Sequence, residues 1–275
     1  MLCNVNEFTY SSMTNKSEVF GHFNNSSLQP ISNSGLQPTL DVKATDEFGN
    51  IRDVSIAEER PITIVLNEQE ITTLMTLGLF PELLSLGYLR NQGLIEEITN
   101  IVSVDVDWSK ETVTIENKCS DKNTVDSCDD NTLPPLLVHE NTISRDTIYS
   151  LLKNIANLNN IYRAAGGVHG CAICSQTNVL FFAEDIGRHN AADIISGYMF
   201  LNNISGINKY LYCTGRLTSE IVIKAARMQV PILISRSGIT RLGLDISKDL
   251  NITLIARAKG THFLIYHSSN TVTYD

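Results

Sequence analysis

Residues 179–201, VLFFAEDIGRHNAADIISGYMFL, decide the fold class because they place a short strand directly before a helix. The apolar run Val179 to Ala183 has the length of a buried strand, and Ala191 to Leu201 follows the spacing of a helix. Asn190 lies where an N-cap is expected. A strand that leads straight into a helix indicates an α/β arrangement, in which the strand ends carry the functional loops.

The polar segment between these two elements, Glu184 to Asp193, is the first candidate site. Free N–H groups and the helix dipole favour an anion at such a position. Arg188 and His189 would supply further donors. A local salt-bridge network is the alternative, but so many polar side chains at a strand end favour a ligand or catalytic site.

Working outward, the C-terminal half continues to alternate apolar runs with helical patterns. This alternation predicts a sheet with helices packed on both faces. The expected helices are Ile143–Leu158, Ser219–Met228 and Ile239–Leu250, and the expected strands are Val168–Ser175, Tyr210–Cys213, Pro231–Ser235, Ile252–Ala256 and a terminal Phe263–His267.

The N-terminal half predicts a smaller lobe that is rich in strands. Alternating residues predict a hairpin that turns at Asn67-Glu68, followed by a helix with Pro81 in its first turn and Gly93 at its end. Two further strands are expected, over Ile98–Val106 and Thr112–Glu116. The predicted organisation is a disordered polar tail (1–45), a β-rich lobe (46–116), a mobile connector that contains cysteines (117–135) and an α/β domain (136–275).

Composition narrows the function classes. The chain has 275 residues, 43% of them hydrophobic, with no apolar run long enough for a membrane span and no secretory signal pattern, so we expect a cytoplasmic protein without a membrane partner. The net charge of −9 argues against nucleic acid as a partner. Residues 1–132 carry 8 basic and 21 acidic side chains, and residues 133–275 carry 13 and 9, so the C-terminal half could receive an anion.

Six cysteines without an export signal are expected to be thiols. His169 precedes the pair Cys171 and Cys174, whose CxxC spacing could indicate a redox or zinc site. If Val168 to Ser175 is a strand, however, residues three apart point to opposite faces and cannot pair or chelate together. We therefore favour small buried side chains for both cysteines.

Three more turns carry basic residues at predicted strand ends. The loops Thr214–Glu220 and Ser235–Thr240 contain Arg216 and Arg236, and they lie where open α/β sheets bind ligands. The basic turn Arg257–His262 could hold phosphate through backbone amides and charge. Simple helix capping, or a solvated turn, would explain each one alone. None matches the Walker or GxGxxG spacing, so ATP hydrolysis and dinucleotide redox chemistry lack support.

Several ordered motifs resemble the FdhD/NarQ family of formate dehydrogenase accessory sulfurtransferases. The resemblance implies a cytidine-deaminase-like α/β/α domain beside a smaller β-rich lobe. It also implies a sulfurtransferase role: persulfide sulfur passes from a cysteine desulfurase to the molybdenum bis(guanine dinucleotide) cofactor of formate dehydrogenase, with a homodimer left open. The motifs are Glu59-Arg60-Pro61, Gly166-Gly167-Val168-His169, Glu184 to Asn190, Gly215-Arg216, Ser235-Arg236-Ser237, Thr253-Leu254 and Tyr266.

The same resemblance suggests roles for individual residues. The family carries a CxxC on the loop between its lobes, where this chain has Cys128 but Asn131 in place of the second cysteine, with Cys119 nearby. The family resemblance thus assigns sulfur transfer to Cys128 and Cys119, and expects no stably bound metal. The guanine dinucleotide is expected to meet the segment Arg257, Ala258, Lys259, Gly260, Thr261 and His262, together with His169, Arg188, His189, Arg216 and Arg236.

Two alternatives remain open. Because the CxxC is broken, the protein could hold the cofactor or chaperone the dehydrogenase without carrying sulfur. A zinc-dependent hydrolase of the deaminase type could use His169, Cys171 and Cys174, although the HxE and PCxxC signatures of that class are missing.

Overall fold

A six-stranded mixed sheet forms the centre of the molecule in a computed structural model that describes residues 36–118, 142–269 and 271–274. β10, β11 and β12 are parallel, while β8, β9 and β13 join by antiparallel pairing. The start of β8 and the end of β9 therefore lie at the edge where β10, β11 and β12 end. In spatial order the strands are β13 (His262–His267), β12 (Thr253–Lys259), β11 (Ile232–Ser235), β10 (Tyr210–Cys213), β8 (His169–Ser175) and β9 (Asn178–Asp185).

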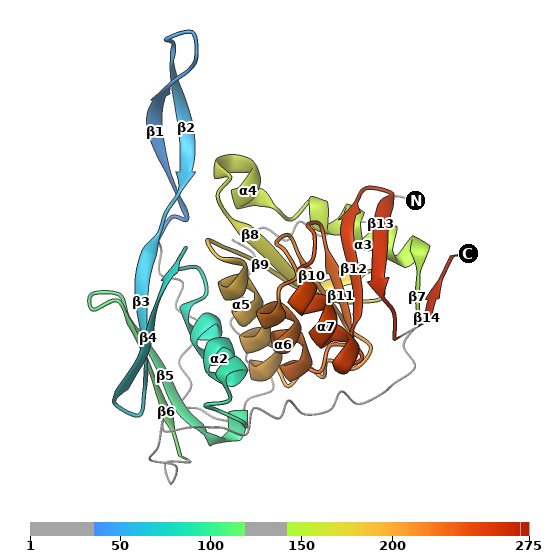
Figure 1. The fold of residues 1–275 in the computed structure, drawn as a ribbon. Helices are drawn as coiled ribbons and strands as arrows, with labels where there is room; N and C mark the ends of the chain where they lie inside the picture. The colour runs from blue at the N-terminus through green and yellow to red at the C-terminus, as the bar shows by residue number, and fades with distance from the viewer. Residues whose placement is uncertain (1–35, 119–141, 270, 275) are drawn as a thin grey trace, which may run out of the picture.

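Helices cover both faces of this sheet, as the sequence predicts (Figure 1). One face packs against α5 (Arg188–Leu201), α6 (Ser219–Arg227) and α7 (Arg241–Asp249). The opposite face packs against α3 (Arg145–Ala156) and a small parallel pair, β7 (Thr142–Ser144) and β14 (Thr271–Thr273). The mixed α/β class is confirmed, whereas the likeness to cytidine deaminase stays a prediction.

Strand alternation along β8 divides four consecutive side chains between two separate cores. Cys171 and Ile173 belong to the core beneath α5, while Ala172 and Cys174 belong to the core beneath α3. Both cysteines are fully buried. The prediction that Cys171 and Cys174 occupy opposite faces as small core residues is confirmed.

The smaller lobe is a four-stranded sheet with one helix. α2 (Pro81–Gln92) lies between this sheet and α5 (Figure 1), begins with Pro81 and ends at Gly93 in the left-handed conformation, as expected. A short 3-10 turn, η2 (Ile98–Asn100), occupies the start of a predicted strand, so that strand begins later. The order is β4 (Gln69–Thr76), β3 (Arg60–Leu66), β6 (Thr112–Asn117) and β5 (Ile101–Asp107).

Two glycines bring α2 and α5 into backbone contact. A Cβ on Gly87 would lie 1.8 Å from the carbonyl oxygen of Asp193, and one on Gly197 would lie 1.9 Å from that of Leu83. No larger residue fits at this separation. The close crossing joins the four-stranded lobe and the helix face of the six-stranded sheet into one hydrophobic core.

An extended hairpin, β1 (Thr39–Thr45) with β2 (Ile51–Ala57), projects from the body (Figure 1). The predicted polar tail, residues 1–45, is therefore wrong over 39–45. The apolar residues of β1 alternate over too short a run to stand out, and antiparallel pairing with β2 supplies the order. Residues 1–35 and 119–141, which hold the rest of the tail and nearly all of the predicted connector, lie outside the described residues.

None of the helices in the described parts of the chain has both the length and the apolar character that a membrane crossing requires.

Candidate functional site

The loops after β10, β11 and β12 meet at the carboxyl edge of the sheet and are hydrogen-bonded to each other. The backbone N–H of Arg236 donates to the carbonyl of Cys213 (3.2 Å), and that of Arg257 donates to the carbonyl of Ser237 (2.8 Å). These bonds hold three basic turns, far apart in sequence, in one layer. The three turns, which the sequence placed after predicted strands, therefore lie together at one edge of the sheet.

His169 enters this edge from the first residue of β8. Gly166 and Gly167 both have positive φ angles (65° and 67°), which a larger residue would adopt only with strain, so the chain can turn sharply into the strand. The hydroxyl of Thr214 lies 3.2 Å from Nδ1 of His169 and accepts from the Gly170 N–H at 2.9 Å. Thr214 therefore orients the imidazole at the end of β10.

The charges of three arginines act on His169. Burial lowers the pKa of its imidazole, and the positive charges of Arg188, Arg236 and Arg216 lower it further. An anion bound at this edge would meet several positive charges. The edge is therefore a cationic site with a neutral histidine among its arginines at neutral pH.

An open pocket of about 540 Å³ lies at the ends of β11 and β12, and Arg236 is part of its lining. Of the predicted basic segment, Arg257, Lys259 and His262 line it, whereas Thr261 does not. Ala258 is only 1% exposed and packs into the core beneath α3, so its side chain does not face the pocket. The complete lining is Arg236, Ser237, Gly238, Arg257, Lys259 and His262.

The basic turn itself is tighter than predicted. β12 extends to Lys259 and β13 begins at His262, so the turn is centred on Gly260 rather than covering 257–262. A register shift interrupts the pairing after Ala256, and Arg257 has a φ of +53°, which is uncommon outside glycine. This irregularity re-aims the strand end toward the pocket, as bulges beside functional sites do. The chain then continues into β14, so β13 is not the last strand.

Tyr162 and Glu184 support the site. Glu184 belongs to the predicted segment Glu184 to Asp193, whereas Tyr162 was not predicted. Arg236 lies over the Tyr162 ring at 5.0 Å from its centroid. The buried carboxylate of Glu184 accepts the backbone N–H groups of Ile161 (3.0 Å) and Tyr162 (2.9 Å), which fixes α4 (Asn160–Ala165). Burial raises the pKa of Glu184, and these bonds oppose the rise. Only the tertiary fold shows this link.

The start of α5 differs from the prediction for Asn190. The helix begins after Gly187, and the Asn190 amide instead donates to the carbonyl of Met75 (2.6 Å) and to Asp185 (2.9 Å). The Asn190 side chain therefore ties the smaller lobe to the end of β9. Its use in a contact between lobes explains why the N-cap prediction was wrong.

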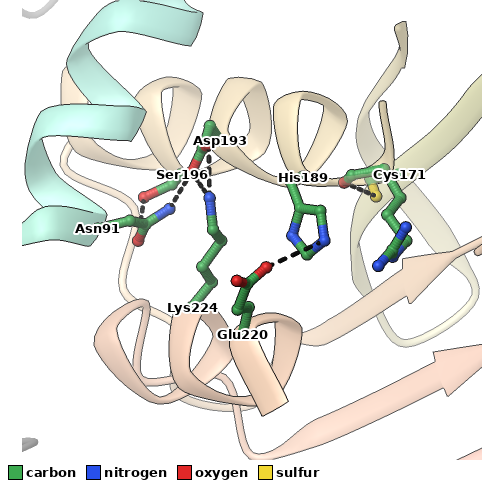
Figure 2. A network of polar contacts seen from close by, with 8 residues as sticks. Asn91, Cys171, His189, Asp193, Ser196, Glu220 and Lys224 are labelled. Carbon is green, nitrogen blue, oxygen red and sulfur yellow. Dashed lines mark hydrogen bonds and ion pairs between the residues drawn. The ribbon is translucent and has the colours of Figure 1, made fainter. Parts of the chain in front are cut away.

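The side chains of Arg188 and His189 make different contacts. The Arg188 side chain packs over Gly215, where a Cβ would lie 2.7 Å from its Cδ, and its buried Nε has no hydrogen-bond partner among the described residues. His189 Nε2 lies 3.1 Å from Glu220 on α6. Figure 2 shows that this pair bridges α5 and α6. Burial lowers the pKa of His189 to about 4, with a further contribution from Arg188.

A buried ion pair connects α5 and α6. Lys224 on α6 lies 2.6 Å from both carboxylate oxygens of Asp193, and Asn91 of α2 donates to the same carboxylate at 2.7 Å (Figure 2). These side chains are at most 9% exposed. They lock three helices together and leave the arginines in front of them as the groups that can meet a ligand.

Chemically, the site offers guanidinium forks, an ammonium, imidazoles and loop amides, which are donors suited to phosphate oxygens. No group of three or more potential metal ligands occurs among the residues that the structure describes. Cys128 and Cys119 lie outside the described residues, so their predicted roles stay predictions.

Comparisons with known proteins agree on one family. The model of the FdhD/NarQ family matches residues 57–273. Curated proteins called sulfur carrier protein FdhD match from Bacillus pumilus (31% identity over 79% of this chain and 90% of the relative) and Bacillus subtilis (30% over 80% and 90%). A solved structure from Desulfotalea psychrophila, described as a formate dehydrogenase accessory protein, superimposes with a TM-score of 0.73 at 26% identity, covering 84% of this chain and 96% of that one.

Proposed function

Because the chain belongs to the FdhD/NarQ family, we propose that it is a cytoplasmic sulfur carrier for formate dehydrogenase, passing persulfide sulfur from a cysteine desulfurase to the molybdenum bis(guanine dinucleotide) cofactor. The cofactor is cargo here, bound while it is modified and then released to its enzyme. The names of the relatives, a sulfur carrier and a formate dehydrogenase accessory protein, support this assignment.

The observation that carries the proposal is the convergence of basic groups at one sheet edge. The charges of Arg188, Arg236 and Arg216 all act on His169, and Arg236 lines a pocket together with Arg257 and Lys259. An anionic cargo would neutralise these charges, and the unpartnered Nε of Arg188 leaves a donor for it. The diphosphate of a guanine dinucleotide supplies such charges, and an open pocket admits a large ligand.

Sulfur transfer would use a thiol of the segment that joins the two lobes. In the proposed step, the thiolate of Cys128 attacks the terminal sulfur of the desulfurase persulfide, its bond to that sulfur forms and the enzyme's S–S bond breaks. The desulfurase cysteine leaves as a thiolate. Cys119 is the second candidate carrier, because Asn131 stands where the family has its other cysteine.

Persulfide mapping tests the carrier step. The full chain is incubated with a cysteine desulfurase and cysteine, trapped with an alkylating agent, digested and examined by mass spectrometry. We expect an extra sulfur on Cys128 or Cys119, lost in the variant that carries Cys128→Ala and Cys119→Ala. Cys174→Ala is the matched control, because Cys174 is buried on the far face of the sheet. Absence of a persulfide from both cysteines would overturn sulfur transfer.

A cofactor-binding chaperone without sulfur transfer is the second candidate, favoured by the single cysteine at the family's CxxC position. In a strain that lacks its own family member, this candidate predicts that the double cysteine variant restores formate dehydrogenase activity as fully as the wild type. The sulfur-carrier proposal predicts that the same variant fails, provided that it accumulates normally.

The zinc hydrolase has the least support. Cys171 and Cys174 face different cores, so they cannot bind one ion together with His169 unless β8 breaks. Elemental analysis of the purified protein checks this: stoichiometric zinc would restore the hydrolase hypothesis.

A further inference from the structure

Cys171 and Cys213 lie directly opposite each other on neighbouring antiparallel strands, β8 and β10. The Thr214 N–H donates to the Gly170 carbonyl at 2.9 Å, so the adjoining residue pair is hydrogen-bonded and the cysteine pair is not. Opposed residues of the second type are the closer ones, with Cα atoms about 4.5 Å apart, within the range that a disulfide spans.

The two thiols face the same core but differ in their surroundings. Both are fully buried on the sheet face beneath α5. The neighbouring Cys213 and complete burial raise the pKa of Cys171 well above its ordinary value. The neighbouring Cys171 lowers the pKa of Cys213, whose sulfur accepts the Gly215 N–H at 3.3 Å, a bond that favours its thiolate. Cys213 is therefore the nucleophile of the pair.

The pair touches the backbone of two residues at the cationic site. The Cys171 sulfur lies 3.8 Å from the carbonyl oxygen of Arg188, the first residue of α5 (Figure 2). Gly215, bonded to the Cys213 sulfur, is the glycine on which the Arg188 side chain packs, and it directly precedes Arg216. A chemical change at the Cys171 sulfur would therefore alter a contact with the backbone of Arg188. A change at the Cys213 sulfur would alter a hydrogen bond with Gly215, the residue before Arg216.

We propose that Cys171 and Cys213 form a redox-sensitive disulfide that regulates anion binding at the cationic site. The inference rests on the proposed function for the identity of the anion, a guanine nucleotide diphosphate. The reduced pair supports the positions of Arg188 and Arg216, and the oxidised pair disturbs them.

The reaction needs a small two-electron oxidant of the peroxide class. The Cys213 thiolate attacks a peroxide oxygen, the O–O bond breaks, and a sulfenic acid forms with release of hydroxide, which takes up a proton to become water. The Cys171 sulfur then attacks the Cys213 sulfur, its S–H bond breaks, and a second water leaves as the S–S bond forms. Two thiols and one hydrogen peroxide give one disulfide and two waters.

Disulfide formation removes both links to the site. The two sulfur atoms form a bond of about 2.05 Å. The S–H group of Cys171 is lost, so it can no longer donate to the Arg188 carbonyl. The Cys213 sulfur moves away from the Gly215 N–H. Since both arginines depend on that backbone, the oxidised form should bind diphosphate more weakly. Complete burial should make oxidation slow compared with that of exposed thiols.

The test uses the full chain, reduced or treated with hydrogen peroxide and then freed of oxidant. Peptide mapping under non-reducing conditions should find a Cys171–Cys213 cross-link that reductant removes. Titration calorimetry with GDP should show affinity lower by about fivefold or more after oxidation, the scale of ordinary coupling between sites. Reduction should restore it.

Two variants separate this pair from the other cysteines. Cys213→Ala and Cys213→Ser should each abolish the peroxide effect on GDP affinity, while Cys174→Ala, one strand face away, should retain it. If neither Cys213 variant folds, the wild-type peptide map and titration decide alone.

An absent cross-link, or a cross-link with unchanged GDP affinity, would overturn the regulation. If the reduced protein does not bind GDP, the cargo site and its coupling both fail. The peptide map would then still decide whether this disulfide forms.

Discussion

Arg257 combines backbone strain with a charge in the pocket, so its two roles can be separated. Its φ of +53° costs a non-glycine residue about 1 kcal/mol, and its side chain is exposed, so little packing would be lost on replacement. We predict that Arg257→Gly stabilises the protein by up to about 1 kcal/mol while weakening GDP binding. Arg257→Ala should weaken GDP binding equally but should not stabilise the protein. Urea denaturation and calorimetry measure both, and equal stability of the two variants would contradict the strain argument.

His189 should make stability depend on pH. Its pKa in the folded protein is about 4, below the ordinary 6.5, so the unfolded chain binds the extra proton between these values. The stability that the neutral imidazole provides is therefore complete above pH 6.5 and falls as the pH decreases toward 4. Because the side chain is partly exposed, we expect a loss of only about 1 kcal/mol from pH 7 to pH 5.

The variant His189→Asn isolates that contribution, because asparagine does not titrate. Urea denaturation of wild type and variant at both pH values gives the difference directly. The wild type should lose about 1 kcal/mol more than the variant on acidification. Parallel losses in the two proteins would show that His189 is equally protonated in the folded and unfolded states.

At the scale of elements, the close crossing of α2 and α5 should tolerate no side chain at its glycines. Alanine normally stabilises a helix interior by about 1 kcal/mol over glycine, yet Gly87→Ala would place a Cβ 1.8 Å from a carbonyl oxygen. We predict a net destabilisation of about 2 kcal/mol or more from overpacking. Gly238→Ala is the matched control, because its Cβ meets no atom within 4 Å and should change stability by less than about 0.5 kcal/mol. A neutral or stabilising Gly87→Ala would contradict the packing.

Most elements could be predicted from sequence because the spacing of their apolar residues agrees with the residues that mark their ends. The hairpin that turns at Asn67-Glu68, the helix between Pro81 and Gly93, and the buried strand with Cys171 and Cys174 are examples. β1 and β2 could not, since their stability comes from pairing with each other rather than from a buried face. The N-cap prediction for Asn190 failed for a similar reason: the Asn190 amide donates to Met75, in a strand distant in sequence.

The site was predictable where one residue type recurs at strand ends. Arg216, Arg236 and the basic turn carry that signal, and parallel strands bring their ends together. Ala258 was predicted as a binding residue only because it lies within a continuous basic segment. The alternation of side chains along the strand directs it into the core instead. Tyr162 was missed, and the role of Glu184 within its candidate segment was not predicted, because both act through α4, whose placement depends on a carboxylate more than twenty residues away.

For the molecule as a whole, the two lobes behave as one packed body with a basic edge. Contacts of α2 with α5 and the hydrogen bond from Asn91 to the buried Asp193 join the lobes behind the site. The uneven charge of the chain has its structural counterpart at this edge, where the C-terminal half gathers its arginines. The proposed cargo binding and sulfur transfer would thus use different parts of the chain, the sheet edge and the segment between the lobes.

Titration of GDP into the wild type and two arginine variants tests the central claim, that this sheet edge binds the cargo, most directly. Arg236→Ala removes a pocket guanidinium, and Arg145→Ala removes an exposed one at the start of α3, on the other face of the sheet. We predict affinity about tenfold or more weaker for Arg236→Ala, the value of one charge-assisted bond, and unchanged affinity for Arg145→Ala. Equal binding by the wild type and Arg236→Ala, or equal losses in both variants, would contradict the account.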